Sequence, residues 1–240
     1  MARPLRIEYP GAWYHVMNRV AGRQRVLDAA THTLFLDLLG ETCERFSVEC
    51  HAYCLLDNHY HLLLHTPRAG LGRALRHLNG LFTQRFNRRR HRDGPLFRGR
   101  YKAILVEADS YLLALSRYIH RNPLEAGLVK QLDRYPWSSY PVYVGQVPSS
   151  GWLITADVLN RVASRSQAAR YREYVERNGE DEVTVFYANQ RHAPILGSEA
   201  FKKLTLRGRR LQAEHAERRR LVRTRSEEHT SELQSRHNLG

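Results

Sequence analysis

The chain has 240 residues, of which 42% are hydrophobic and 10% aromatic. This is enough to form one well-packed hydrophobic core, with a small appendage in addition. Its formal net charge of +14 argues against an enzyme that acts on small neutral substrates and favours a polyanionic binding partner. Nucleic acid is the first candidate. No segment approaches ~18 uninterrupted apolar residues, and residues 1–10 lack the apolar run of a secretion signal. We therefore expect a cytoplasmic protein that does not act at a membrane.

Strand and helix patterns alternate along the first half of the chain. Aromatic and β-branched residues predict a strand over residues 13–20, and apolar residues at helical spacing predict a helix over 31–46. Strands then fit residues 48–56 and 59–66, and the turn-prone Asp-Asn pair between them predicts an antiparallel hairpin.

The pattern continues with a helix over residues 71–90 and, after an Asp-Gly-Pro break, a strand over 97–106. Asp109 is expected to cap a helix that runs to about Arg121. The order strand, helix, hairpin, helix, strand, helix predicts an α+β fold, in which helices pack on an antiparallel sheet.

A Pro-, Ser- and Gly-rich stretch near residues 136–150 marks a predicted domain boundary. We predict a core domain over residues 1–145 and a mostly helical, basic appendage over 146–224, with a helix-turn-helix-like pair of helices as one interpretation. Residues 225–240 have no apolar periodicity and look like a translated sequencing adapter, which predicts a non-native tail.

His59 and His61 are the first candidate site. Positions i and i+2 of a strand point to the same face, with Cα atoms roughly 6.6 Å apart, so the two imidazoles could share one divalent ion. Tyr60, Leu62 and Leu64 would then point together into the core. Two ordinary polar positions on an exposed strand face would give the same pattern, so a second motif is needed to choose between these interpretations.

A structural zinc site is the alternative, because Cys50 and Cys54 precede the two histidines. On a strand these cysteines would lie ~13 Å apart, too far to bind one tetrahedral ion. With Cys43 they form an odd, irregularly spaced set, which predicts reduced thiols and no disulfide framework.

Tyr118 and Asn122 form the second candidate site, on the border of the apolar stripe of the helix predicted over residues 109–121. The i to i+4 spacing puts the phenol and the amide on adjoining turns of one face. Ordinary packing of Tyr118, with Asn122 and Pro123 capping a following short helix, explains the same residues.

Three ordered motifs resolve these alternatives: LLDNHYHLLL at 55–64, GPLFRGRY at 94–101 and YIHRNP at 118–123. Together, over roughly residues 3–144, they resemble the REP-associated tyrosine transposases, members of the HUH single-strand transposase superfamily. The resemblance implies a ferredoxin-like antiparallel sheet with the histidines on a central strand. A tyrosine between the histidines departs mildly from the family pattern, which usually has an aliphatic residue or phenylalanine there.

By motif, the resemblance implies that His59 and His61 bind the metal, that Tyr118 is the nucleophile and that Asn122 is a third ligand. The implied cofactor is Mg²⁺ or Mn²⁺, and the implied partner is single-stranded or hairpin DNA. Attack by Tyr118 would leave a 5′-phosphotyrosine and a free 3′-hydroxyl. The hydroxyl of another strand could later attack the phosphotyrosine and rejoin the DNA.

Between residues 81 and 102 the chain carries eight basic residues against Asp93 alone, which predicts a DNA-binding surface. A second basic tract, over residues 201–223, could clamp DNA. Arginine and lysine would bind phosphates, while Tyr101 could either stack on a base or be buried. The candidate DNA contacts are Arg85, Arg88, Arg89, Arg98, Arg100, Lys102 and Tyr101.

Two other functions remain open at this stage. One is a catalytically silent DNA-binding regulator that keeps a transposase scaffold, and the other is a metal-dependent phosphodiesterase that uses water in place of Tyr118. Covalent capture on DNA would distinguish them. Monomer and homodimer are both compatible with the sequence.

Overall fold

The computed structural model describes residues 7–23, 27–162, 165–177, 179, 182–188 and 193–208. The chain divides into two compact units, Met1–Gly197 and Ser198–Gly240, and the sheet with its helices lies in the first. In the second unit, residues 199–208 are helical. The adapter-like segment 225–240 lies outside the described residues.

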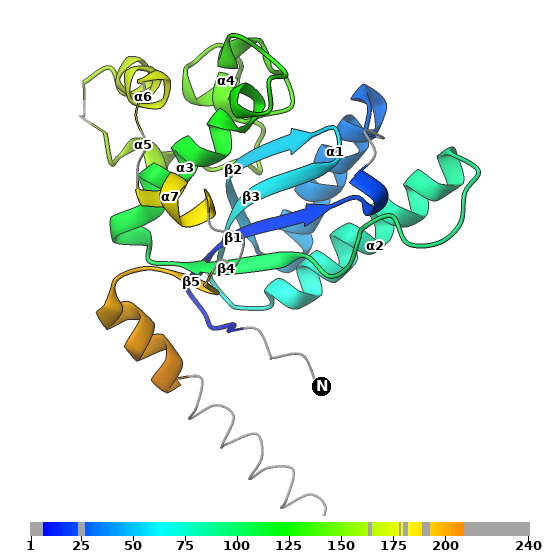
Figure 1. The fold of residues 1–240 in the computed structure, drawn as a ribbon, viewed down its shortest axis with the longest axis horizontal. Coiled ribbons are helices and arrows are strands. Elements are labelled where there is room, and N and C mark those ends of the chain that lie inside the picture. Colours follow the sequence, from blue (N-terminus) through cyan, green and yellow to red (C-terminus); the bar gives the residue numbers. More distant parts are fainter. Residues whose placement is uncertain are drawn as a thin grey trace, which may run out of the picture. The chain divides into compact units, whose positions relative to one another are not determined.

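Five strands form one sheet in the order β2-β3-β1-β4-β5 (Figure 1). The first four pair antiparallel and β5 adds a parallel edge. Their bounds are β1 Ala12–Arg19, β2 Glu49–Leu56, β3 His59–Thr66, β4 Lys102–Val106 and β5 Ile195–Leu196. With the helices α1 (Ala29–Phe46) and α2 (Leu71–Arg89) in between, the βαββαβ order confirms the predicted ferredoxin-like α+β fold.

The hairpin of β2 and β3 is confirmed, with Asp57 and Asn58 as its turn. The predicted strand over 97–106 is too long, because only Lys102–Val106 is strand and Phe97 makes an isolated bridge to Val20. Within β2 the pairing register shifts between Cys50 and Ala52, which is a β-bulge at position 51.

The helices α1 and α2 cover one face of the sheet (Figure 1). Tyr60 points to this face, where its ring lies 4.7 Å from the ring of Phe35, and Phe35 lies 5.1 Å from Phe82. Asp28 caps α1 through a capping box with Thr31. Among the helices of the described residues, none is long and apolar enough to span a membrane.

The opposite face is covered by α3 (Ala108–Glu125), whose apolar stripe is buried against the strands (Figure 1). The predicted cap at Asp109 is wrong: the helix begins at Ala108, Glu107 is the N-cap, and it makes no side-chain capping bond. Pro123 lies inside α3, so Asn122 does not begin a separate helix.

The chain beyond α3 forms short helices that pack beside it. Their bounds are η2 Leu132–Arg134, α4 Tyr140–Tyr143, α5 Ala156–Leu159, α6 Gln167–Glu176 and α7 Glu182–Ala188, and an earlier 3-10 turn, η1, spans Ala21–Arg23. Val158, Tyr171, Val175 and Val183 join the core cluster under α3. The segment predicted to be mostly helical also contains β5, whose two residues pair with β4 through backbone bonds that helical periodicity does not reveal.

Candidate active site

The strand β3 presents its odd-numbered side chains to the face covered by α3, as period-two alternation requires. His59 lies opposite Arg19 of β1, and His61 lies opposite Met17, which in turn lies opposite Lys102 of β4. The ring centroids of the two histidines are 5.1 Å apart. The histidine pair therefore lies in the middle of the sheet, with Arg19 and Lys102 on its β1 and β4 side.

A cavity of ≈ 560 Å³ opens over these strands. We call it the His–Tyr pocket, and its lining residues are Met17, Asn18, Arg19, His59, His61, Arg98, Gly99, Arg100, Lys102, Tyr118, Asn122 and Tyr187. The structure thus brings together the histidine pair, the tyrosine and asparagine of α3, and part of the predicted basic surface.

A chain of hydrogen bonds orients the ring of His61. His61 Nδ1 lies 2.9 Å from His15 Nε2, and His15 Nδ1 lies 2.5 Å from the hydroxyl oxygen of Tyr187. If each Nδ1–H donates outward along this chain, His61 Nε2 keeps its lone pair. That nitrogen is buried and has no hydrogen-bond partner, as expected of an atom that serves a ligand.

His59 has a similar arrangement, because its Nδ1 lies 2.6 Å from the side-chain oxygen of Asn58 and donates to it, which leaves Nε2 as the acceptor. Burial and the neighbouring Arg19 lower the pKa of His59 to about 4. Burial, His15 and His59 hold the pKa of His61 well below its usual range. Both rings are neutral at pH 7, which is the form that binds metals.

Tyr118 comes from α3, and its ring edge lies over the histidines, 6.0 Å from the His61 ring centroid. Tyr187 of α7 stacks on it at 4.4 Å. Burial raises the pKa of the Tyr118 phenol to about 12, against the lowering effect of Arg19. The phenol is therefore protonated at neutral pH and is held rigidly beside the imidazoles.

Asn122 lies one turn beyond Tyr118, and its Nδ2 donates to the Tyr118 carbonyl at 2.7 Å. With the amide nitrogen engaged in this way, Oδ1 is the atom available to the pocket. Two imidazole nitrogens and an amide oxygen suit Mn²⁺ and accept Mg²⁺ with water in its remaining positions. The three residues fit the divalent ion that the sequence implies.

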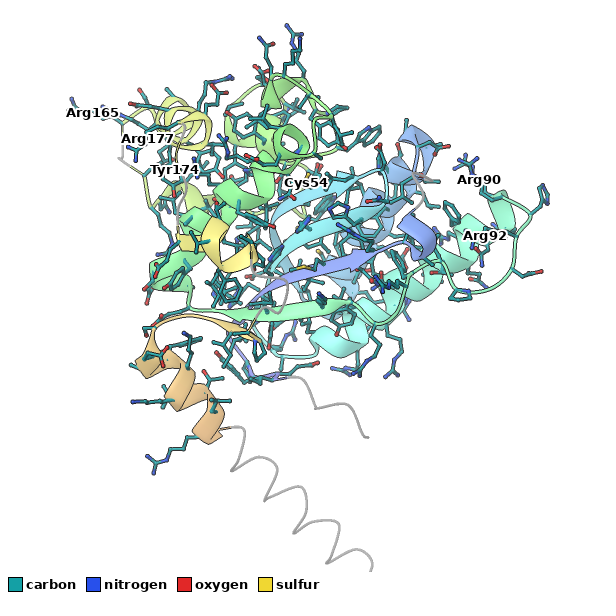
Figure 2. All side chains as sticks on the ribbon, in the orientation of Figure 1. Cys54, Arg90, Arg92, Arg165, Tyr174 and Arg177 are labelled. Atoms are coloured by element: carbon teal, nitrogen blue, oxygen red, sulfur yellow. The ribbon has the colours of Figure 1, made fainter. Side chains whose placement is uncertain are left out.

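The predicted DNA contacts separate into two groups. Arg98, Arg100 and Lys102 line the His–Tyr pocket, whereas exposed side chains on the C-terminal half of α2 do not. That second group is Arg85, Arg88 and Arg89. Figure 2 shows Arg90 and Arg92, which follow them, at the end of α2 that lies away from α3.

Tyr101 does not offer a ring for base stacking. Its side chain is only 8% exposed, as is that of Phe97, because the segment before β4 turns both rings toward the core. For Tyr101 the sequence left base stacking and burial open, and the structure shows that the side chain is buried. Base stacking in the pocket would fall to other rings.

The zinc alternative fails on geometry. Cys54 pairs with His61, but Cys50 pairs with Leu64, whose side chain points to the opposite face of the sheet. Burial raises the pKa of both thiols well above the usual range. The two cysteines cannot reach one ion with the histidine pair.

Sequence reasoning missed Arg19 and Tyr187, which line the pocket, and His15, which is hydrogen-bonded to His61. The period-two spacing of His15 and Arg19 in the strand over 13–20 could have placed both on the face of the histidine pair. Tyr187 lies 69 positions after Tyr118 on a short helix. No local pattern relates it to the site.

Comparison with known proteins agrees with this geometry. A family model described as "Transposase IS200 like" matches residues 8–122. A REP-associated tyrosine transposase of Haemophilus influenzae is 29% identical over 133 residues, covering 48% of this chain and 76% of that protein. Over residues 8–122 the chain is thus similar to the IS200-like transposases, which are enzymes.

A solved structure of a REP-associated tyrosine transposase bound to a REP hairpin has the same fold, with a TM-score of 0.54 and 18% identity. The match covers 63% of this chain and 92% of that chain. The family span, 8–122, begins just before β1 and ends at Asn122, so it contains all the candidate catalytic residues. Tyr187 lies outside it and is a feature of the chain beyond the family model.

Proposed function

We propose that this protein is a transposase, a metal-dependent single-strand DNA endonuclease and strand transferase that acts through a 5′-phosphotyrosine intermediate on hairpin or repeat DNA. The observation that supports this most is the convergence of Tyr118, His59, His61 and Asn122 in one pocket lined by cations. A tyrosine hydroxyl beside two neutral imidazoles has the chemistry of a nucleophile at a metal site.

His59, His61 and Asn122 would hold Mg²⁺ or Mn²⁺. When bound, such an ion polarises an oxygen of the scissile phosphate and neutralises part of its charge. The protein's contribution is to fix the ligands: His15 and Asn58 hold the two rings in the tautomers that leave each Nε2 free. Arg98 and Arg100 would hold the flanking phosphates.

Tyr118 would carry out the covalent step. Its phenolic oxygen forms a bond to phosphorus while the bond from phosphorus to the 3′-oxygen breaks, so the phenolic proton passes to solvent and the departing oxygen becomes a 3′-hydroxyl. The phosphate ester is kept as a phosphotyrosine, and a 3′-hydroxyl of another strand can reverse the step. No nucleotide cofactor is required.

Residues 1–145 would carry out catalysis, and the basic segment 146–224 would help to hold DNA. Residues 225–240 would take no part. The reaction would take place on chromosomal DNA in the cytoplasm. The enzyme would act as a monomer or as a homodimer, since each pocket is complete within one chain.

We expect the protein to bind a single-stranded hairpin from its own genome at least about tenfold more tightly than a random duplex of equal length. The related structure contains a REP hairpin, and the proposed chemistry needs an accessible backbone, which a flexible single strand offers. Fluorescence anisotropy at moderate salt measures both affinities. Equal or tighter binding of the duplex would contradict the proposed substrate.

We expect Arg98→Gln with Arg100→Gln to lower the affinity for the hairpin and to reduce the slope of log K against log salt by about 1.4, since each lost phosphate contact on a single strand is worth about 0.7. Both residues line the His–Tyr pocket. Arg88→Gln with Arg89→Gln, at exposed positions of α2, is the matched double variant of equal charge change. A larger loss of hairpin affinity in the α2 variant would indicate that the DNA binds along α2 and not at the pocket.

A further inference from the structure

A second cluster of metal-binding residues lies at the other end of β3. Glu49 and His51 of β2 and His65 of β3 each offer one ligand atom, and these atoms lie within 4.8 Å of one another. Glu49 pairs directly with His65, and the bulge at His51 adds an extra residue next to this pair. His65 is four residues from His61, ~13 Å along the strand, so the cluster is separate from the His–Tyr pocket.

The imidazole of His51 is the unexplained part of this cluster. Its side chain is completely buried, yet neither ring nitrogen makes a hydrogen bond. Two carboxylate oxygens lie near it: Glu49 Oε2 is 3.7 Å from Nε2, and Asp157 Oδ2 is 3.5 Å from Nδ1. A buried ring with two unsatisfied nitrogens is costly unless a ligand engages it.

A simple ion pair explains only two of the three residues. His65 Nδ1 lies 2.6 Å from Glu49 Oε2, which is a good hydrogen bond. His51 is not part of this hydrogen bond, because its Nε2 lies 3.7 Å from Glu49 Oε2 and neither of its ring nitrogens makes a hydrogen bond. The buried ring of His51 is therefore left unexplained by the ion pair.

We infer that Glu49, His51 and His65 bind one transition-metal ion of the zinc type, at a site independent of the His–Tyr pocket and of the proposed function. Two imidazole nitrogens and one carboxylate oxygen are a donor set that zinc favours, whereas Mg²⁺ and Ca²⁺ prefer oxygen alone. Glu49 is the most exposed of the three side chains, at 37%, so water can complete the coordination from the solvent side.

Asp157 completes the arrangement from α5. With His51 Nε2 turned toward the ion, His51 Nδ1–H points at the Asp157 carboxylate, which is the outer carboxylate that metal-bound histidines usually have. The ring of Trp13 packs on both histidines, 4.3 Å from His51 and 4.5 Å from His65. The ion would thus tie β2 to β3 and fix α5 to the sheet, and it would displace the proton shared by His65 and Glu49.

The test uses a His59→Ala/His61→Ala background, which removes the two imidazoles of the His–Tyr pocket. Metal-free protein is titrated with Zn²⁺ by calorimetry and with Co²⁺ by visible absorption, and melting is followed with and without Zn²⁺. Glu49→Gln and His65→Gln each remove one ligand at a partly exposed position, and Asp157→Asn removes the outer carboxylate. The matched control is His77→Gln, because His77 pairs with Glu41 at 3.2 Å without a third ligand.

We expect one equivalent of Zn²⁺ in the background protein, a tetrahedral Co²⁺ spectrum and a higher melting temperature with Zn²⁺. Asp157→Asn should weaken binding about 10- to 100-fold, and Glu49→Gln or His65→Gln at least as much, while His77→Gln has no effect. Folding of each variant is checked by circular dichroism. The inference would be overturned if the folded background protein did not bind Zn²⁺, or if Glu49→Gln and His65→Gln bound Zn²⁺ as tightly as the background protein does. Neither result depends on the outcome of the DNA cleavage assay.

Discussion

Replacing Tyr118 by phenylalanine is expected to abolish the covalent protein–DNA adduct and to lower cleavage on the order of a thousandfold or more. Phenylalanine keeps the ring that stacks on Tyr187 at 4.4 Å, so packing and DNA affinity should change little. The only chemical loss is the phenolic oxygen. A labelled hairpin with Mg²⁺ or Mn²⁺, a denaturing gel and peptide mapping of the adduct measure the result.

Tyr111→Phe is the matched control, because Tyr111 is a partly buried tyrosine of the same helix that does not line the His–Tyr pocket. It should leave the adduct intact. An adduct that maps to Tyr111 or Tyr101 would keep the reaction class and overturn the residue assignment. Cleavage that persists in Tyr118→Phe without any adduct would identify water as the nucleophile, and DNA binding without cleavage by the unaltered protein would favour the silent regulator.

The second large effect is expected for His61→Ala, which should lower cleavage on the order of a hundredfold or more while leaving hairpin affinity nearly unchanged. His61 Nε2 is a buried ring nitrogen without a hydrogen-bond partner in the pocket, whereas the DNA phosphates would be held by arginine and lysine. Single-turnover cleavage over a range of Mn²⁺ concentrations, with anisotropy for binding, separates the two effects.

His77→Ala serves as the control for removal of a histidine, since His77 lies on α2 and pairs with Glu41. Thermal melting must accompany the His61 experiment, because the change removes the buried hydrogen bond between His61 Nδ1 and His15 Nε2, at a cost of about 1–3 kcal/mol. Unchanged cleavage by folded His61→Ala would remove the metal pair from the proposed mechanism.

Local pattern was sufficient to predict the frame of the fold. The strand over His59–Thr66 was predicted with the bounds observed, because a two-residue turn fixes where it starts. The period-two geometry of a strand placed His59 and His61 on one face. Helical spacing placed Tyr118 and Asn122 on adjoining turns, and both line the pocket.

What local pattern could not supply is contact between distant segments. The His15–His61 bond joins two strands, and Tyr187 reaches the pocket from a helix far along the chain. Burial of Tyr101 depends on how the segment before β4 turns, which its alternating sequence does not specify. The missing cap at Asp109 shows the same limit, since the helix begins where the strand ends and not where the best capping residue lies.

His59, His61 and His65 lie on one face of β3, and this placement limits which substitutions, insertions and deletions the strand can accept. A substitution at Leu62 or Leu64 changes packing but leaves each histidine on its face. Insertion or deletion of one codon between His61 and His65 turns one end of the strand over, so that a histidine enters the apolar layer under α1 and α2. A one-residue change of length in this part of the strand therefore disrupts a histidine site, whereas a change of residue at Leu62 or Leu64 does not move the histidines.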